Sequence, residues 1–268
     1  MRNRPWPIEL DIYSAIIGLN PLMVQGPGGN TSFKNENTLW IKSSGTRLSN
    51  AKDQEIFVGV AVGSRSVIDS QTRLKPSIEI DFHLLIPYPY VIHTHSLRSL
   101  SMGIVQNFGE CAARFPDIAF VNYARPGKQL CELISQSIDF NVHKAAILQN
   151  HGFLTWGNTM EEAYSVLEKF ENGVDLPVII EAIAGYEASI GNHPQAITPD
   201  YAVFLSPCTR SEILEFSGQD LWKKQMYLVA EQACALAKAE SEINYLSASE
   251  VNSLQNWDAE KFRIAANK

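Results

Sequence analysis

Two histidines separated by a single residue stand in an apolar stretch of the chain. His93 and His95 end a run, Pro89 to His95, whose composition is typical of a buried strand. Side chains two positions apart on a strand point to the same face, so the two imidazoles can converge on one ion. Pairs of imidazole nitrogens suit zinc and related divalent metals. The spacing therefore indicates part of a metal site, although a lone His-x-His is a weak signal.

A third histidine follows another apolar run. His151 lies in the segment Gln149-Asn-His-Gly, directly after Ala145 to Leu148. Three protein ligands with an open fourth position describe a catalytic metal site rather than a structural one. The remaining histidines have no such setting and are expected to be ordinary surface or packing residues; they are His83, His143 and His193.

A carboxylate precedes the histidine pair in the segment Pro76-Ser-Ile-Glu. Pro76 suits the first position of a helix, because its missing N–H costs nothing there. This predicts Ser77 in the first turn and Glu79 one turn in. A glutamate at this position can shuttle a proton beside a metal, or it can simply compensate the helix dipole on the surface, as most first-turn glutamates do.

Two loops rich in small residues lie earlier in the chain, at Gln25 to Ser32 and at Ser43 to Thr46. Glycines there can adopt positive φ and leave backbone N–H groups free, so the two loops can form a nest of amide and hydroxyl donors for a phosphate. The Gly-Lys-Ser/Thr ending of a Walker A loop is absent. A pair of simple turns remains an equally good interpretation. Lys34, Lys42 and Arg47 lie nearby and can add charge, although a solvated loop position is the more common fate of such residues.

Both helices and strands are needed to position these residues. The sequence predicts helices over Ile8–Leu19, Leu97–Gln106, 128–138, 159–188 (with Pro177 as a kink) and Leu221–Glu240, and strands over Thr38–Lys42, Glu55–Ala61, Pro89–His95, Ile118–Tyr123, Ala145–Asn150 and Phe153–Trp156. Residues 194–207 are expected to be a proline-punctuated connection and residues 244–268 a polar tail. Strands and helices alternate as in one α/β domain, and most strand links are too short for parallel crossovers, so the sheet should be largely antiparallel.

Composition excludes several classes of function. The chain has 268 residues and a net charge of -7, whereas nucleic-acid or anionic-membrane binding normally requires a basic excess. Its four cysteines are far apart and are expected to be reduced thiols. No secretory signal precedes the first helix, and no apolar run is long enough to span a bilayer. We therefore expect a cytoplasmic protein with a single domain over residues 1–268 and a C-terminal helical extension from about residue 210.

The motifs together resemble the class II aldolase/adducin family. The resemblance covers about residues 8 to 190 and rests on five segments in order, which are Gly28-Gly-Asn-Thr-Ser, Ser43-Ser-Gly-Thr, Pro76-Ser-Ile-Glu, His93-Thr-His and Asn150-His-Gly. Tyr123-Ala-Arg-Pro-Gly and the tail residues Tyr245, Glu250 and Trp257 make the chain most similar to the aldolase part of bifunctional rhamnulose-phosphate aldolase/dehydrogenase proteins.

The resemblance implies a three-layer α/β/α fold with a mainly antiparallel central sheet, assembled as a homotetramer with active sites at subunit interfaces. It implies that His93, His95 and His151 hold a divalent ion, usually zinc, with manganese or another ion as alternatives. Glu79 matches the catalytic base, and Tyr123 matches a tyrosine acid that reaches a neighbouring subunit's site. The positions that fall where the substrate phosphate is bound are Asn30, Thr31, Ser43, Ser44, Gly45 and Ser77.

The chemistry expected from residues and resemblance together is reversible aldol cleavage of a ketose 1-phosphate or related sugar, through an enediolate stabilised by the metal. Ile78 replaces a second serine found before the glutamate in many phosphate-using relatives, which removes one hydroxyl donor from the expected phosphate site. Epimerases, dehydratases and decarboxylases share the fold and site, but no His-Ala-Asp-Tyr segment typical of the epimerases follows His95. A non-catalytic adducin-like interaction domain is the alternative outside enzymes.

Overall fold

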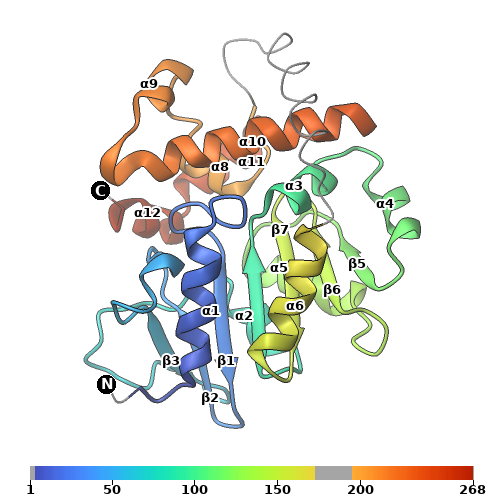
Figure 1. The fold of residues 1–268 in the computed structure, drawn as a ribbon. Helices are drawn as coiled ribbons and strands as arrows, with labels where there is room; N and C mark the ends of the chain where they lie inside the picture. Colours follow the sequence, from blue (N-terminus) through green and yellow to red (C-terminus); the bar gives the residue numbers. More distant parts are fainter. Residues whose placement is uncertain (1–3, 173–194, 268) are drawn as a thin grey trace.

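A mixed sheet of seven strands runs through the centre of the protein (Figure 1). The computed structural model describes residues 4–172 and 195–267. In the order β3-β2-β1-β4-β7-β6-β5, every neighbouring pair is antiparallel except β5 and β6, which are joined through a helix. The prediction of a largely antiparallel sheet is confirmed. The strands are β1 (Asn30–Lys34), β2 (Thr38–Lys42), β3 (Phe57–Ala61), β4 (Tyr90–Thr94), β5 (Ile118–Val121), β6 (Ala145–Leu148) and β7 (Gly152–Gly157).

Helices cover both faces of this sheet. Helices α1 (Ile8–Leu19) and α6 (Met160–Glu171) lie on one face, and α2 (Ile80–Leu85) and α5 (Lys128–Ser137) lie on the other (Figure 1). Alternation along β4 divides the core accordingly, because Ile92 packs into the cluster that contains α1 and α6 whereas Val91 packs with α2 and α5. The fold is therefore the expected three-layer α/β/α arrangement.

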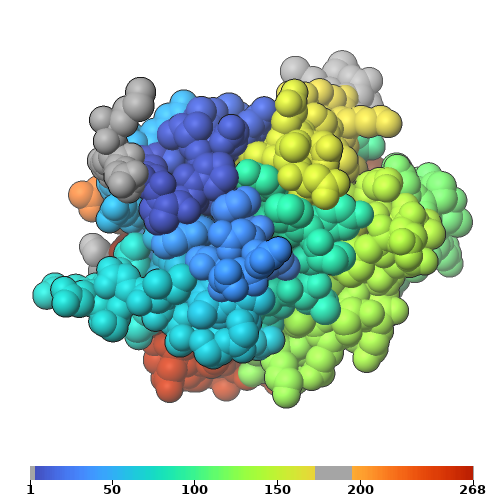
Figure 2. Space-filling model, turned by 90° about the horizontal axis from the view of Figure 1, so that it is seen from below, coloured from blue at the N-terminus to red at the C-terminus, as the bar shows by residue number. Residues whose placement is uncertain are grey.

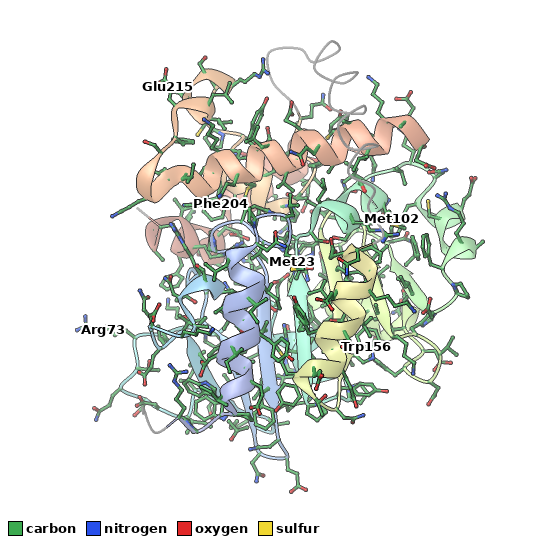
Figure 3. The ribbon with its side chains drawn as sticks, in the orientation of Figure 1. Met23, Arg73, Met102, Trp156, Phe204 and Glu215 are labelled. Carbon is green, nitrogen blue, oxygen red and sulfur yellow. The ribbon has the colours of Figure 1, made fainter. Side chains whose placement is uncertain are left out.

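The C-terminal helices gather at one end of the sheet, where β4 ends and β1 and β7 begin (Figure 1). Seen from the opposite end in Figure 2, the C-terminal part of the chain appears only at the margin. Figure 3 places Phe204 of α8 and Met23 toward the upper end, with Trp156 of β7 further down the sheet. The helices of this region are α3 (Leu97–Gly103), α8 (Pro199–Phe204), α9 (Arg210–Glu215), α10 (Leu221–Glu240), α11 (Ala248–Asn256) and α12 (Asp258–Ala265); α4 (Phe108–Cys111) and short 3-10 turns complete the set described.

Three sequence expectations about helices were wrong. Residues 194–207 are not only a connection, because α8 begins at Pro199, with Thr198 as a cap whose hydroxyl accepts from the Tyr201 N–H at 3.1 Å. The tail from residue 244 contains α11 and α12. Glu79 stands at the N-cap position of α2, one residue before the helix, since the helix begins at Ile80 rather than at Pro76.

The helix expected from Thr159 begins as predicted, and the structure assigns it through Glu171. Its predicted continuation past Pro177 to Ala188 lies outside the described residues, as does His193. Within residues 4–172 and 195–267, no helix combines the length and apolar character needed to cross a bilayer.

Candidate metal centre and substrate pocket

The three predicted histidines meet at the end of the sheet that faces the C-terminal helices. His93 is on β4, His95 follows that strand and His151 immediately precedes β7, which pairs with β4. All three are buried, and one ligand atom from each lies within 4.8 Å of the others. The Nε2 atoms of His93 and His95 are 3.0 Å apart. The neighbouring strands thus bring together side chains that are far apart in the sequence.

Local backbone geometry places His151. Asn150 adopts a φ of 54° in the turn between β6 and β7, and its side-chain Nδ2 donates to the carbonyl oxygens of Ile197 at 2.8 Å and Asn244 at 2.6 Å. Gly152 follows, where an added Cβ would lie 2.1 Å from the Thr94 carbonyl oxygen. The Asn-His-Gly segment therefore holds the His151 ring against β4, because a larger residue after it would separate the two strands.

Two of the three imidazole rings are held by their outer nitrogens, whereas His151 Nδ1 is buried without a hydrogen-bond partner among the described residues. His93 Nδ1 donates to the Phe153 carbonyl oxygen at 3.0 Å, and His95 Nδ1 lies 3.1 Å from Asp200 Oδ2. These contacts leave the Nε2 atoms directed at the centre of the cluster. Burial is the largest influence on His93 and holds its pKa well below the ordinary range, so this ring is neutral and can donate a lone pair to a metal.

Glu79 lies against the open side of the cluster. Its Oε1 is 2.9 Å from His151 Nε2 and 3.5 Å from His93 Nε2, and its Oε2 accepts a hydrogen bond from Asn30 Nδ2 at 2.6 Å. Burial raises the pKa of Glu79, but the neighbouring rings of His93 and His151 outweigh it and hold the pKa well below the usual range. A carboxylate in its ionised form therefore stands beside the three nitrogens.

This donor set fits a divalent cation. Three imidazole nitrogens with an adjacent carboxylate are ligands that zinc accepts, and a catalytic zinc site keeps a position open for substrate. Apart from the nearby ring nitrogens of His151 and His93, the buried Glu79 Oε1 has no hydrogen-bond partner among the described residues. An ionised oxygen in this state is costly unless a cation is near, which supports the predicted site.

His83 is a residue of the site for which the sequence pattern predicted only an ordinary surface or packing role. It is fully buried, its Nε2 donates to Asn30 Oδ1, and its Nδ1 accepts from Ser32 Oγ at 2.7 Å. Burial is the main cause that lowers the pKa of His83 to about 3. The ring orients Asn30, which in turn holds Glu79. The position of α2 over β1 creates this contact, and no local motif signals it.

The residues predicted to bind phosphate are only partly brought together. Asn30, Ser44, Gly45 and Ser77 line the pocket that opens beside His95, His151 and Glu79. An isolated bridge between Ser43 and Pro76 joins the loop after β2 to the segment before α2, and Gly45 takes a φ of 80° that other residues rarely adopt. These two segments form the side of the pocket where the phosphate is predicted to bind.

Thr31 and Ser43 differ from the expectation. Thr31 follows Asn30 on β1, so its side chain points to the opposite face, where its hydroxyl lies 2.6 Å from Ser14 Oγ of α1. Strand alternation alone could have separated these two neighbours. Ser43 is not among the residues that line the pocket, and its carbonyl oxygen accepts the Thr46 hydroxyl at 2.8 Å.

Tyr123 does not reach the pocket of its own chain. Its hydroxyl donates to Glu250 Oε1 of α11 at 3.0 Å, and Arg125 contacts the same carboxylate at 3.4 Å. Burial, followed by the Glu250 charge, raises the pKa of Tyr123. A separate surface pocket is lined by these three residues.

Three charged residues of the pocket were not among the predicted site residues. Lys42 is buried and donates to the carbonyl oxygens of Pro27 at 2.8 Å and Thr46 at 2.7 Å; burial is the main cause that lowers its pKa to about 7. Asp200 and Arg263 enter from α8 and α12. The Thr-Pro-Asp helix start signals α8, but only the tertiary structure shows that Asp200 reaches His95.

Fold and site define a three-layer α/β protein with a buried three-histidine centre. Residues 19–176, more than half of the chain, match the family described as Class II Aldolase and Adducin N-terminal domain. The chain belongs to this family, which confirms the resemblance of its motifs.

Several curated proteins are similar to the chain. An L-fuculose phosphate aldolase of Methanococcus maripaludis (strain C5) is 29% identical over 168 residues, which are 59% of this chain and 87% of that protein. A 5-deoxy-D-ribulose 1-phosphate aldolase of Bacillus thuringiensis is 28% identical over 163 residues, which are 56% of this chain and 73% of that protein. An uncharacterized oxidoreductase of Bacillus subtilis, YuxG, is 29% identical over 203 residues, and the match spans 62% of this chain but only 29% of that protein.

Solved structures share the fold. The N-terminal class II aldolase domain of a conserved Thermoplasma acidophilum protein has a TM-score of 0.54 at 24% identity, covering 64% of this chain and 95% of that domain. An aldolase II superfamily protein from Pseudomonas syringae has a TM-score of 0.52 at 17% identity, and the match covers 89% of this chain and 97% of that protein. These likenesses establish the α/β architecture over most of the chain.

Proposed function

We propose that the protein is a metal-dependent aldolase that cleaves a ketose, in particular a ketose 1-phosphate or a related sugar. The observation that carries this proposal is the convergence of three buried histidines with Glu79, whose Oε1 lies 2.9 Å from His151 Nε2. Membership of the class II aldolase and adducin family supports it, and so do the relatives named as sugar-phosphate aldolases.

His93, His95 and His151 are the residues that would hold the metal, for which zinc is the first choice and manganese or another divalent ion the alternative. Such an ion, when bound, acts as a Lewis acid that polarises the substrate carbonyl. Because the rings of His93 and His95 are oriented by outer contacts with the Phe153 carbonyl and Asp200, their ligand atoms need little reorganisation to receive it.

Glu79 would move the proton. In the cleavage direction, the bond between the carbon next to the carbonyl and the carbinol carbon breaks; the carbinol carbon becomes the aldehyde and its hydroxyl loses a proton. The carbon that retains the electron pair then takes up a proton, which Glu79 can deliver and, in the reverse direction, remove. The hydrogen bond from Asn30 fixes Oε2, which leaves Oε1 directed into the pocket.

The phosphate of the substrate would occupy the loop side of the pocket. Ser44 Oγ is buried and has no hydrogen-bond partner among the residues described, so it is available as a donor. Asn30, Gly45 and Ser77 complete the cradle, and Lys42 adds a nearby cation. Ile78 also lines this pocket where a second hydroxyl is expected, so Lys42 is the group that compensates for the missing donor.

Tyr123 would act as the acid and base for the aldehyde oxygen in the site of a neighbouring subunit. We infer this role because Tyr123 lies outside the pocket of its own chain. The role requires a homotetramer with active sites at the subunit interfaces. A mixture of two inactive variants tests it. Glu79→Gln and Tyr123→Phe subunits, dissociated and reassembled together, should regain part of the wild-type activity, because some interfaces then combine an intact Glu79 with an intact Tyr123.

The proposal as a whole is tested by reloading the purified protein with zinc or manganese and offering a panel of ketose phosphates, starting with L-fuculose phosphate and 5-deoxy-D-ribulose 1-phosphate. Release of an aldehyde supports it. Formation of an isomer, loss of water or release of carbon dioxide would instead assign epimerase, dehydratase or decarboxylase chemistry to the same site. Failure to bind metal, together with no turnover, would favour the non-catalytic alternative.

We further infer one domain over the whole chain, with the helices from about residue 210 as its extension, and action on small sugars in the cytoplasm. The contacts of α12 with the pocket support the single domain, since Arg263 lines the same cavity as His95.

A further inference from the structure

Asp200 contacts the histidine cluster from outside the residues that match the family. It lies in the first turn of α8, beyond the matched range of residues 19–176. Its side chain is 4% exposed, and its Oδ2 is 3.1 Å from His95 Nδ1. The C-terminal part of the chain therefore places a buried carboxylate directly behind one of the metal-site histidines.

The two oxygens of Asp200 have different partners. Oδ1 is 2.8 Å from Arg263 Nη2 on α12, while Oδ2 faces His95. Arg263 is fixed in turn by Glu260, whose carboxylate oxygens accept from Nη1 at 3.0 Å and 2.9 Å. A carboxylate held at one oxygen by a buried guanidinium has little freedom to turn, so the second oxygen stays directed at the imidazole.

The Gly-rich loop is shaped to permit this contact. A Cβ added at Gly28 would lie 2.9 Å from both Asp200 Oδ2 and His95 Nδ1. Any larger residue at this position would press on both partners. The absence of a side chain here thus leaves room for the approach of the carboxylate and the ring, which is a second observation that points to the same contact.

We propose that Asp200 is a positioning residue of the metal site, which fixes His95 with its proton on Nδ1 and its Nε2 lone pair directed at the ion. This inference rests on the proposed function, because it assumes that the histidines bind metal. Carboxylates in this position orient a metal-bound histidine and make it a stronger ligand. His93 has a backbone carbonyl as its corresponding partner, so His95 is the ligand whose strength depends on the C-terminal helices.

The test compares Asp200→Asn with Glu260→Gln. Both variants remove one carboxylate from Arg263, but only the first changes the partner of His95. Zinc affinity is measured by competition with a chromophoric chelator, and the ligand environment is followed by the visible spectrum of the cobalt-substituted protein. Asp200→Asn should bind zinc about 10- to 100-fold more weakly and shift the cobalt bands. Glu260→Gln keeps a side-chain oxygen that can accept from Arg263, so Asp200 stays in place and this variant should remain within about 3-fold of the wild type, with an unchanged spectrum.

The outcomes separate the two claims. A wild-type protein that binds no divalent ion overturns the proposed function. A wild type that binds zinc, with Asp200→Asn equal to it in affinity and cobalt spectrum, overturns the positioning role alone. Equal losses in both variants would assign Asp200 to the stability of α12 and overturn the positioning role as well.

Should Asp200→Asn not fold, the wild type provides the second measurement. In zinc-loaded protein labelled with ¹⁵N at histidine, a multiple-bond ¹H–¹⁵N spectrum distinguishes rings protonated on Nδ1 from those protonated on Nε2. His93 and His151 also direct Nε2 at the cluster, so the inference requires a slowly exchanging Nδ1 proton on the His95 ring itself, which is assigned by its proximity to Gly28. A His95 ring without that proton would overturn it.

Discussion

Acidification should destabilise the protein through His83, a buried ring that is not itself a metal ligand. His83 is neutral in the native state, because burial lowers its pKa to about 3, whereas in the unfolded chain a histidine has a pKa near ~6.5. Between these values the unfolded state binds the proton more tightly. Stability contributed by the neutral ring is therefore complete above the unfolded pKa and falls as the pH decreases toward the folded pKa.

The size of this effect follows from the two pKa values. At pH 5, protonation of the unfolded histidine lowers the free energy of unfolding by about 2 kcal/mol relative to pH 7.5, while the native ring remains almost unprotonated. His83→Gln removes this contribution. Glutamine can replace both hydrogen bonds, since its oxygen can accept from Ser32 and its amide can donate to Asn30.

The assay is urea unfolding of the metal-free wild type and the His83→Gln variant at pH 7.5 and pH 5. The wild type should lose about 2 kcal/mol more than the variant between the two conditions. His143→Gln serves as the matched control, because that ring is only partly buried and accepts from the Asp139 N–H near the surface. A wild-type loss within about 0.5 kcal/mol of that in His83→Gln would refute the interpretation of His83 as a neutral buried link to the site.

Three further predictions concern the site. Glu79→Gln should keep its metal but lower kcat for aldol cleavage by about 10²- to 10⁴-fold, and unchanged cleavage would remove Glu79 from the mechanism. Asp81→Asn in the first turn of α2 removes only an ion pair with an exposed arginine and should leave kcat within about twofold. His93→Ala should reduce bound divalent metal from about one ion per chain to a trace, as measured by elemental analysis after dialysis, and a full complement would contradict the site. Ser44→Ala should raise KM for a phosphorylated ketose by about 10-fold and not for the free sugar, while equal changes for both would argue against a phosphate contact.

The convergence of the histidines was predictable because strand periodicity is a local property. His93 and His95 share a face whichever strands pair with β4, and the family motifs imply His151 as the third ligand. The same periodicity argues against pairing Asn30 with Thr31 in one pocket, and the structure places their side chains on opposite faces. Local patterns are therefore reliable where the geometry of one element decides which way a side chain points.

The supporting residues were not predictable because their roles depend on how separate elements pack. His83 orients Asn30 only because α2 lies over β1. Asp200 and Arg263 reach the cluster only because the C-terminal helices cover the end of the sheet. Spacing in the sequence carries no information on contacts between α8, α12 and β4. Motifs thus identify the groups that do chemistry more readily than the groups that hold them.

The charges of the pocket add an argument for both a metal and an anionic substrate. Lys42, Arg263, Glu79 and Asp200 line the pocket, and the buried carboxylate of Glu260 pairs with Arg263 behind it. These five buried groups together have one negative charge in excess. Burial lowers the pKa of Lys42 and raises that of Glu260, each to about 7, so that near neutral pH their losses of charge cancel and the excess remains. A buried negative excess is unfavourable without a cation. A divalent ion would reverse its sign, and the resulting positive site would attract a phosphate or an oxyanion of the substrate.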